Sequence, residues 1–391
     1  MTATPAVTRV VVTDVTRLLG RLIKGRLPTG VDRVSLEYVR HYRGRSRAMV
    51  AVAGRWVALN GVDSQRLFNA LLEPRRRSAL AACWCVARSY LLSWRFGLTG
   101  AILLNTGHSG LEHARYAARV RRHRLMPVYF LHDLIPITHP EFCRPGDSRK
   151  HRQRLTTMLS TGMALVVNSL DTGRNLAGHA DRTGQVIPPW VVAPVAPARL
   201  PAPGSGRPIF APYFVILGTI EPRKNHLLLL QLWRQLVVEL GNQAPRLVVI
   251  GQRGWECEQV VDLLDRCEVL RDCVLERAKC GDQDLATWLH HAQALLFPSF
   301  VEGFGMPLVE ALAMGVPVIA SDLPVFRETA AAVPEYLDPL DGRAWKQSIL
   351  AYTQPDSAPR RAQLSRMTAF HAATWAEHFS LVDGLMASCL Q

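Results

Sequence analysis

Residues Phe297–Glu328, which read FPSFVEGFGMPLVEALAMGVPVIASDLPVFRE, decide the fold class of this chain. An apolar, strand-like run ends at Pro298, and a loop that contains glycines follows it. The spacing predicts a helix from about Pro307 to Ala313, with the proline suited to its first turn, and then a buried strand at Val316–Ala320. Buried strand, turn, helix and buried strand are the repeating unit of a parallel sheet with helices on both faces.

The same alternation occurs along the whole chain and predicts an α/β fold with two parallel sheets. Short apolar runs are each followed by a turn and a longer helical pattern. Between them, the segment Ala198–Pro212 is rich in proline and glycine and can continue neither a helix nor a central strand. We therefore expect an N-terminal domain at 1–200, a linker at 201–212 and a C-terminal domain from 213. The other predicted strands are Arg9–Val12, Ala101–Asn105, Pro127–His132, Ala164–Asn168, Tyr213–Leu217, Arg246–Ile250 and Ala294–Phe297.

The composition is that of a folded protein in a reducing compartment. Of 391 residues, 48% are hydrophobic and 20% are charged. The eight cysteines form no Cys-x-x-Cys pair and have no zinc-finger spacing with histidine. The first residues do not form a signal peptide, and the apolar runs are too short to span a bilayer. We predict a cytoplasmic protein that can also lie on the inner face of the plasma membrane.

The net charge of +14 is unevenly distributed. Residues 1–200 hold 30 Lys and Arg against 11 Asp and Glu, which gives +19, whereas residues 201–391 hold 16 against 21, which gives −5. The basic half could contact nucleic acid, an anionic membrane surface or a phosphorylated substrate, or it could be only a solvated basic face. Against nucleic acid, the chain has no zinc-finger or RNA-recognition signature, and the acidic half would repel a phosphate backbone.

The loop after Pro298 carries the first group of candidate site residues. Gly303 and Gly305 allow backbone N–H groups to approach a ligand closely. These amides precede a helix N-terminus, where an anion such as a diphosphate is stabilised. Glu302 lies in the loop and Glu310 eight residues later, so that one carboxylate can reach a sugar and the other a ribose. The alternative is a glycine-rich turn with two solvated glutamates.

The segment Leu217–His226, LGTIEPRKNH, carries the second group. It follows the first predicted strand of the C-terminal domain and places Arg223 and Lys224 at a turn. Arg can bind a phosphate through two parallel N–H bonds, and Lys adds a compact charge. Together they can neutralise a diphosphate leaving group. The alternative, a basic helix start on the surface, is disfavoured because cations are unfavourable at a helix N-terminus.

These two segments resemble those of the retaining, two-Rossmann-domain glycosyltransferases (GT-B fold, family-four or group 1 type). The similarity is most specific over about residues 213–330. In the N-terminal half, LPTGVDRV at Leu27–Val34 and HDLIPITHP at His132–Pro140 resemble segments of bacterial capsule, O-antigen and exopolysaccharide mannosyltransferases. The resemblance also implies that a C-terminal helix, in 371–391 after a domain at 213–370, returns to the N-terminal domain.

The resemblance implies a role for each candidate residue. Glu302 would hold the hydroxyls of the donor sugar and Glu310 the ribose, while Arg223 and Lys224 would bind the diphosphate. His132, at the end of a predicted strand, would contact the transferred sugar, although a structural histidine is the alternative.

Backbone and glycine positions complete the set of candidate donor-binding residues. Gly218 and Thr219 follow the strand, and Thr219 departs from the family pattern because many relatives have Arg there. The backbone at Gly303, Phe304 and Gly305 would support the sugar or the phosphates. Gly30, after the first strand, would let its loop approach the donor or the acceptor.

The resemblance further implies the reaction. The acceptor hydroxyl attacks the face from which the nucleotide diphosphate leaves, so the anomeric configuration is retained and no dedicated base is required. HDLIPI favours mannose from GDP-mannose, with UDP-sugars as the next choice. The acceptor would be a glycan or a polyprenyl-diphosphate-linked oligosaccharide in surface polysaccharide synthesis. We expect no cofactor and no metal, because Asp282-Gln283-Asp284, a D-x-D sequence, is explained by helix N-capping.

Three further expectations follow from the sequence. Arg75–Arg77 and Arg121–Arg124 could bind anionic lipid headgroups, and Tyr90–Phe96 could anchor the chain, although a buried amphipathic helix is the alternative for Tyr90–Phe96. A nicotinamide-dependent oxidoreductase is disfavoured because no Gly-x-Gly-x-x-Gly lies at a strand–helix turn. An inactive scaffold on the same fold remains the non-enzymatic alternative.

Overall fold

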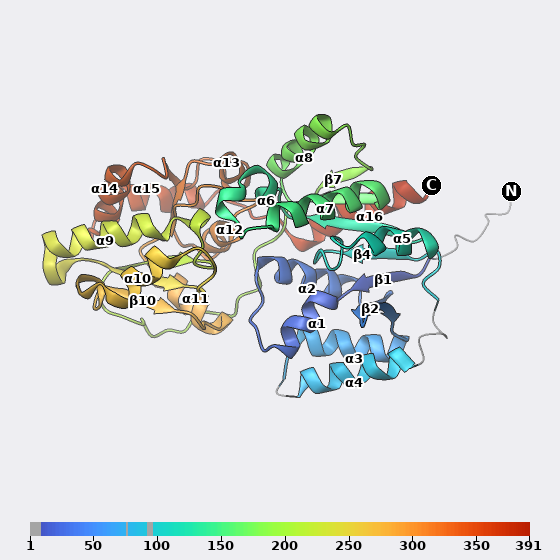
Figure 1. Cartoon of the computed structure of the whole chain (residues 1–391). Coiled ribbons are helices and arrows are strands. Elements are labelled where there is room, and N and C mark those ends of the chain that lie inside the picture. Colours follow the sequence, from blue (N-terminus) through green and yellow to red (C-terminus); the bar gives the residue numbers. More distant parts are fainter. Residues whose placement is uncertain (1–8, 76, 92–96) are drawn as a thin grey trace.

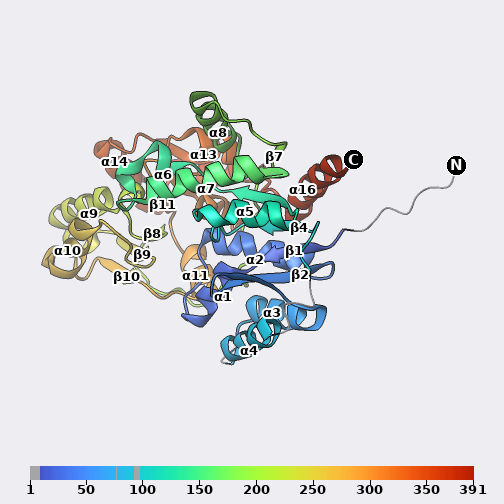
Figure 2. The same cartoon turned by 45° about the vertical axis from the view of Figure 1, so that its right-hand side comes forward.

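The computed structural model describes residues 9–75, 77–91 and 97–391. The chain forms two lobes that lie side by side, each built around its own sheet (Figures 1 and 2). Arg76 and residues 92–96, which belong to the predicted lipid-binding segments, lie outside the described residues. None of the helices that the structure describes combines the length and the apolar character needed to span a bilayer.

Within the described residues, the first sheet has seven strands in the order β3-β2-β1-β4-β5-β6-β7. All neighbouring strands are parallel except β2 and β3, which pair antiparallel with Val50 opposite Val57. The strands are β1 (Val11–Asp14), β2 (Ser46–Val52), β3 (Arg55–Ala58), β4 (Ile102–Asn105), β5 (Met126–Leu131), β6 (Ala164–Val167) and β7 (Trp190–Val192).

The second sheet has six strands in the described residues, in the order β10-β9-β8-β11-β12-β13, and all of them are parallel. The second sheet therefore follows the doubly wound order 3-2-1-4-5-6 in its own numbering. The first sheet has the same order with an antiparallel β3 and an additional seventh strand. The strands are β8 (Tyr213–Leu217), β9 (Arg246–Ile250), β10 (Val274–Arg277), β11 (Leu295–Phe297), β12 (Val318–Ser321) and β13 (Glu335–Leu337).

Helices cover both faces of each sheet (Figure 1). Central strands such as β6 and β12 are buried along their whole length, which explains their continuous apolar sequence. The first lobe contains α1 (Thr16–Ile23), α2 (Gly30–Tyr42), α3 (Gly61–Leu72), α4 (Ser78–Leu91), α5 (Ala114–Arg122), α6 (Ile135–Thr138), η2 (Pro140–Phe142), α7 (Asp147–Thr161) and α8 (Leu170–Thr183). From the second half of the chain come η3 (Pro222–Lys224), α9 (His226–Leu240), η4 (Gly241–Gln243), α10 (Glu258–Arg266), η5 (Glu268–Leu270), α11 (Asp282–His290), α12 (Met306–Ala313), α13 (Pro324–Ala330), α14 (Gly342–Thr353), α15 (Ala358–Met367) and α16 (Trp375–Leu390).

The last helix, α16, packs on the first lobe although it ends the chain (Figure 1). It begins with a capping box in which Thr374 and Glu377 bind each other's backbone N–H. His378 then lies 3.1 Å from the carbonyl of Ala193 and 3.0 Å from the hydroxyl of Tyr38. The chain thus connects the two lobes twice, once through residues 198–212 and once before α16.

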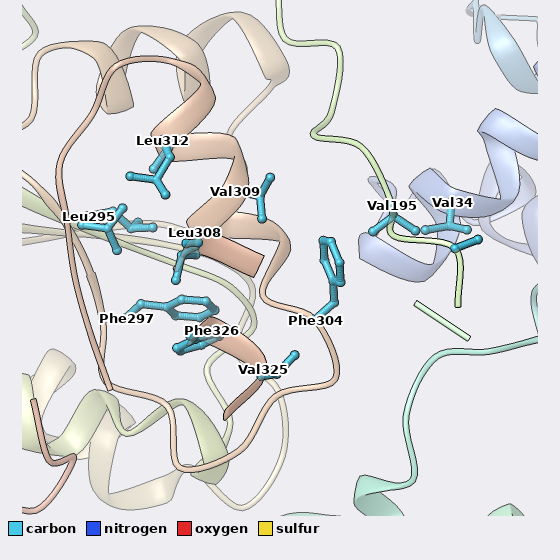
Figure 3. Packing of buried hydrophobic residues seen from close by; sticks show 14 of the residues in the cluster. Val34, Val195, Leu295, Phe297, Phe304, Leu308, Val309, Leu312, Val325 and Phe326 are labelled. Atoms are coloured by element: carbon cyan, nitrogen blue, oxygen red, sulfur yellow. The ribbon is translucent and has the colours of Figure 1, made fainter. Parts of the chain in front are cut away.

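The main apolar core of the second sheet extends to the boundary between the lobes. Phe297 and Phe326 stack with their ring centroids 4.9 Å apart beneath α12. Figure 3 shows Phe304 on the side of this group that faces Val34 and Val195 of the first lobe. Apolar packing therefore reaches the boundary directly beside the loop that contains Glu302.

The structure corrects several details of the sequence prediction. The first strand begins at Val11 rather than Arg9. The largely buried strand β2 and the partly exposed strands β3, β7, β10 and β13 were not predicted. Gly30 does not directly follow the first strand, because α1 intervenes and Gly30 instead begins α2. The N-cap of α11 is Gly281, so Asp282 is not the capping residue but the first residue of the helix.

Candidate functional site

The two predicted site segments of the second lobe lie together at the centre of its sheet. The strand order reverses between β8 and β11, which is where doubly wound sheets bind ligands at their carboxyl ends. Residues 218–224 leave β8, and residues 298–305 leave β11. The backbone N–H of Phe300 donates to the carbonyl of Arg223 over 2.8 Å and joins the two segments.

Glu302 is the centre of a buried ion-pair network. Lys224 Nζ lies 2.5 Å from one carboxylate oxygen, and Arg223 Nη1 lies 2.6 Å from the other. Ser299 donates its hydroxyl to the first oxygen over 2.8 Å. Arg223 also pairs with Glu221 at 2.5 Å. Glu221, Lys224 and Glu302 are buried, whereas the side chain of Arg223 is 22% exposed. The buried charges are tolerated because each has a partner of opposite charge.

The cations control the ionisation of Glu302, whereas burial prevails at Glu221. Burial alone would raise the pKa of Glu302, but Arg223 and Lys224 outweigh burial and lower it to about 2. Burial raises the pKa of Glu221 and lowers that of Lys224, whose ammonium also lies 4.6 Å from the ring centre of Phe297. Glu302 is consequently a fixed anion at neutral pH, and it positions both cations.

Each of the two segments contains a glycine that a neighbouring side chain approaches too closely for a larger residue to fit. A Cβ on Gly218, at a φ of +144°, would lie 3.3 Å from Lys224 Cε. A Cβ on Gly305, at a φ of +92°, would lie 2.6 Å from the ring of Phe326. Side chains at these positions would therefore displace the lysine or distort the start of α12.

His132 reaches the same place from the first lobe. It follows β5, is buried, and donates Nε2–H to the carbonyl of Thr106 over 2.7 Å. Burial lowers its pKa to about 4, so the ring is neutral at pH 7 and Nδ1 is its acceptor nitrogen. A Cβ on Gly303 would lie only 2.7 Å from the carbonyl oxygen of His132. The structure therefore brings His132 and the Glu302 loop together across the lobe boundary.

Hydrogen bonds from the start of α8 fix this contact. Ser169 donates its hydroxyl to the carbonyl of Gly303 over 2.9 Å, and Asn168 donates to the carbonyl of His132 over 2.9 Å. The carboxylate of Glu328 accepts the N–H groups of Leu170 and Asp171 at the α8 N-terminus. The two lobes are thus closed against each other through polar groups.

Two further histidines lie near His132. The sequence GHSG at 107–110 predicts a strand-to-helix loop that could line the acceptor side, and it contains His108, whereas His151 was not predicted. His108 donates to the carbonyl of Phe130 over 2.7 Å, and His151 donates to that of Asp133 over 3.0 Å. Burial lowers the pKa of both rings. The ring centre of His108 lies 5.2 Å from that of His132 and 6.0 Å from that of His151. The pattern could not reveal this cluster, because three distant segments contribute to it.

Glu310 is buried in α12, apart from the Glu302 network. Burial raises its pKa to about 7, and Arg33 of α2 opposes the shift. Arg33 forms an ion pair across the boundary, with Nη2 2.6 Å from Asp282 Oδ1 at the start of α11. Arg33 was not predicted as a site residue, and Asp282 was expected only to cap its helix.

Gly30 and Phe304 lie at the same boundary. A Cβ on Gly30 would lie 4.0 Å from the side chain of Met306, which places the start of α2 beside the start of α12. Phe304 is buried and contributes packing. Thr219 lies within the second lobe, where a Cβ on Gly254 would lie 2.7 Å from its Cγ2. Within residues 9–75, 77–91 and 97–391, no three His, Cys, Asp or Glu side chains converge to hold a metal ion.

Comparison with known proteins gives a family for the second lobe. Residues 207–333 match the family described as glycosyl transferases group 1. The chain is 31% identical over 244 residues to O-antigen chain mannosyltransferase B of Escherichia coli, which covers 60% of this chain and 63% of that protein. It is 26% identical over 259 residues to the serotype-specific mannosyltransferase WbdA of Escherichia coli, covering 61% of this chain and 32% of that protein. The chain thus spans between about a third and two thirds of these relatives.

Solved structures extend the similarity to both lobes. HepE of Anabaena, in complex with UDP and glucose, has a TM-score of 0.69 at 14% identity and covers 97% of this chain and 100% of its own. Sucrose-phosphate synthase of Thermosynechococcus elongatus has a TM-score of 0.58 at 16% identity and covers 88% of this chain and 83% of its own. The predicted fold class is confirmed, because the chain has the GT-B fold. Its residues 207–333 match the family described as glycosyl transferases group 1.

Proposed function

We propose that the chain is a metal-independent, retaining glycosyltransferase that transfers mannose from GDP-mannose to a glycan or polyprenyl-diphosphate-linked oligosaccharide in surface polysaccharide synthesis. The observation that carries this proposal is the buried Arg223–Lys224–Glu302 network at the carboxyl edge of the second sheet. Two cations fixed beside two glycine-containing loops can bind a diphosphate and stabilise the charge that develops on it. The relatives named as mannosyltransferases support the sugar.

The step requires only a few groups of the chain. The bond between the anomeric carbon and the diphosphate oxygen breaks, and a bond to the acceptor oxygen forms on the same face. The acceptor proton passes to the leaving phosphate oxygen. Arg223 and Lys224 hold the diphosphate, while neutral His132 offers Nδ1 to a sugar hydroxyl from across the boundary. Because the cations are supplied by side chains, the proposed step needs no metal.

The choice of guanine is supported by Asp282. Guanine presents two neighbouring N–H donors, N1–H and N2–H, whereas uracil presents one N–H between two carbonyls. A carboxylate can accept both guanine donors at once. Asp282 lies near Glu310, the proposed ribose-binding carboxylate, and both interact electrostatically with Arg33. We propose that guanine binds the Asp282 carboxylate in place of Arg33.

We also propose that the chain is cytoplasmic and can lie on the inner face of the plasma membrane. Nucleotide sugars are cytoplasmic substrates, and each of the eight cysteines, among them exposed Cys83, is a free thiol in the structure. Free thiols fit a reducing compartment.

Titration calorimetry with GDP- and UDP-sugars in the presence of EDTA tests this function, together with slow donor hydrolysis. We expect micromolar binding of GDP-mannose, insensitivity to EDTA, and weaker binding in Lys224→Ala. Asp282→Asn should reduce the preference for GDP over UDP, because an amide cannot accept two donors side by side. Failure to bind any nucleotide would instead favour the inactive scaffold, and a requirement for added Mg²⁺ would contradict metal independence.

A further inference from the structure

Helix α4 exposes large apolar side chains on one face. Leu80, Trp84 and Leu91 are 73%, 72% and 77% exposed, whereas Ala82, Cys85, Val86 and other residues of the opposite face are buried. The hairpin of α3 and α4 lies at the lower edge of the first lobe in both views, below α1 and α2 (Figures 1 and 2). Single exposed leucines are ordinary, but a Trp with two leucines on one helix face marks an interaction surface.

The exposed side chains form one continuous stripe. Leu80 and Trp84 are four residues apart and Leu91 is seven residues further on, so that all three project from the same side of the helix. Arg88 lies between Trp84 and Leu91, and Arg77 precedes Leu80 by one turn. The stripe therefore alternates apolar groups with cations whose aliphatic stems can also lie on an apolar layer.

The charge around the stripe is positive. Residues 61–91 hold five Arg against two carboxylates, a net +3. Of the carboxylates, Asp63 is buried and lies 3.4 Å from Arg88, and Glu73 lies outside α4 at 3.6 Å from Arg75. The α4 sequence itself contains no acidic residue.

We infer that this face of α4 docks on an anionic lipid surface. A helix that lies in the plane of a membrane buries a stripe of Trp and Leu at the depth of the headgroups and holds Arg at the phosphate level. The positive surroundings favour an anionic bilayer over a second copy of the chain, because two such faces would repel each other. The inference extends the proposed function, since it names the surface on which a lipid-linked acceptor would be met.

Sedimentation of the full chain with lipid vesicles tests this surface. The vesicles contain either phosphatidylcholine alone or phosphatidylcholine with phosphatidylglycerol. We expect binding to the phosphatidylglycerol vesicles, weakened by salt, and about 10-fold weaker partitioning of the double variant Leu80→Ser, Trp84→Ser. Leu340→Ser is the matched control, because Leu340 is also 77% exposed but lies in the second half of the chain.

Brominated lipids provide a second readout. They should quench part of the tryptophan emission in the wild-type chain and less of it in Trp84→Phe. Absence of vesicle binding, equal binding of the double variant and the Leu340→Ser control, or a wild-type dimer that the double variant loses would each overturn the inference. Donor hydrolysis without vesicles should be unchanged in the α4 variants, so failure of this inference is distinguishable from failure of the proposed glycosyl transfer.

Discussion

The carboxyl edges of the two sheets have the same strand order but different chemistry. At the second sheet, Arg223, Lys224 and Glu302 form a buried network of full charges. At the first sheet, buried His132 and partly buried His108 are neutral and donate to backbone carbonyls. A charged edge suits a diphosphate, whereas a neutral polar edge suits sugar hydroxyls. The difference indicates that the lobes divide the proposed reaction between leaving group and sugar.

The largest expected effect is at the charged edge. Lys224→Ala removes one of two cations and leaves Glu302 partly unpaired. We expect a 100- to 1,000-fold loss in kcat/KM for the donor and about 3 kcal/mol lower stability. Donor turnover and urea unfolding measure these changes. Lys346→Ala, which removes a surface pair with Glu239, is the control and should alter stability by less than about 1 kcal/mol. Turnover of Lys224→Ala close to the wild-type rate would refute the role of the charged edge.

At the neutral edge, His132→Asn is the corresponding change. The amide can still donate to the carbonyl of Thr106, so the fold should persist. We expect about a 30-fold lower kcat, since the variant lacks the Nδ1 acceptor that we propose to contact a sugar hydroxyl. Because the pKa of His132 is about 4, the pH profile between 6 and 8 should keep its shape. If the pH dependence of kcat between pH 6 and 8 disappeared in His132→Asn, the histidine would titrate in that range. The first sheet would then not have a neutral edge.

Glu310 is neither permanently charged like Glu302 nor neutral like His132, because its pKa is about 7. It should therefore produce the pH dependence of donor binding. Its pKa of about 7 means that the carboxylate form, which accepts ribose hydroxyls, is the minor form at pH 6. Donor affinity should rise about 10-fold between pH 6 and pH 8 in calorimetry, and Glu310→Gln should abolish the rise. The matched control is Glu239→Gln on the surface.

Glu310 should also make folding stability depend on pH, but stability should fall as the pH rises, whereas donor affinity should increase. The pKa is raised from 4.5 to about 7 in the folded chain, so the folded state binds more protons than the unfolded state between those values. The contribution of Glu310 is therefore present below about pH 4.5 and is lost as the pH rises towards 7. Glu310→Gln should stabilise the chain at pH 8, and a destabilised variant there would contradict this assignment.

The sequence predicted the charged edge better than the neutral one, for a physical reason. Strands β8 and β9 were predicted to the residue, because central parallel strands are continuous apolar runs. Edge strands such as β10, which reads VLER, are half-exposed and lack that pattern. Arg223, Lys224 and Glu302 lie within two short segments whose residue types already indicate anion binding. Arg33 and Asp282 meet only after folding, 249 residues apart, so no local pattern could pair them.

The smallest expected effect comes from alanine substitutions of two glycines at the lobe boundary, Gly303 and Gly30. Gly303 lies against a fixed carbonyl, whereas Gly30 lies near a flexible side chain. A Cβ on Gly303 meets the His132 carbonyl at 2.7 Å. Asn168 donates to that carbonyl and Ser169 donates to the carbonyl of Gly303, so both sides of the contact are held in place. The lobes must then move apart, and we expect about a 5-fold lower kcat in Gly303→Ala with little change in donor affinity. Gly30→Ala places its methyl 4.0 Å from the flexible Met306 side chain and should stay within about 2-fold of wild type. Only Gly303→Ala alters the contact between the Glu302 loop and His132. Equal kinetics in the two variants would therefore mean that the charged edge functions without close contact to the neutral edge.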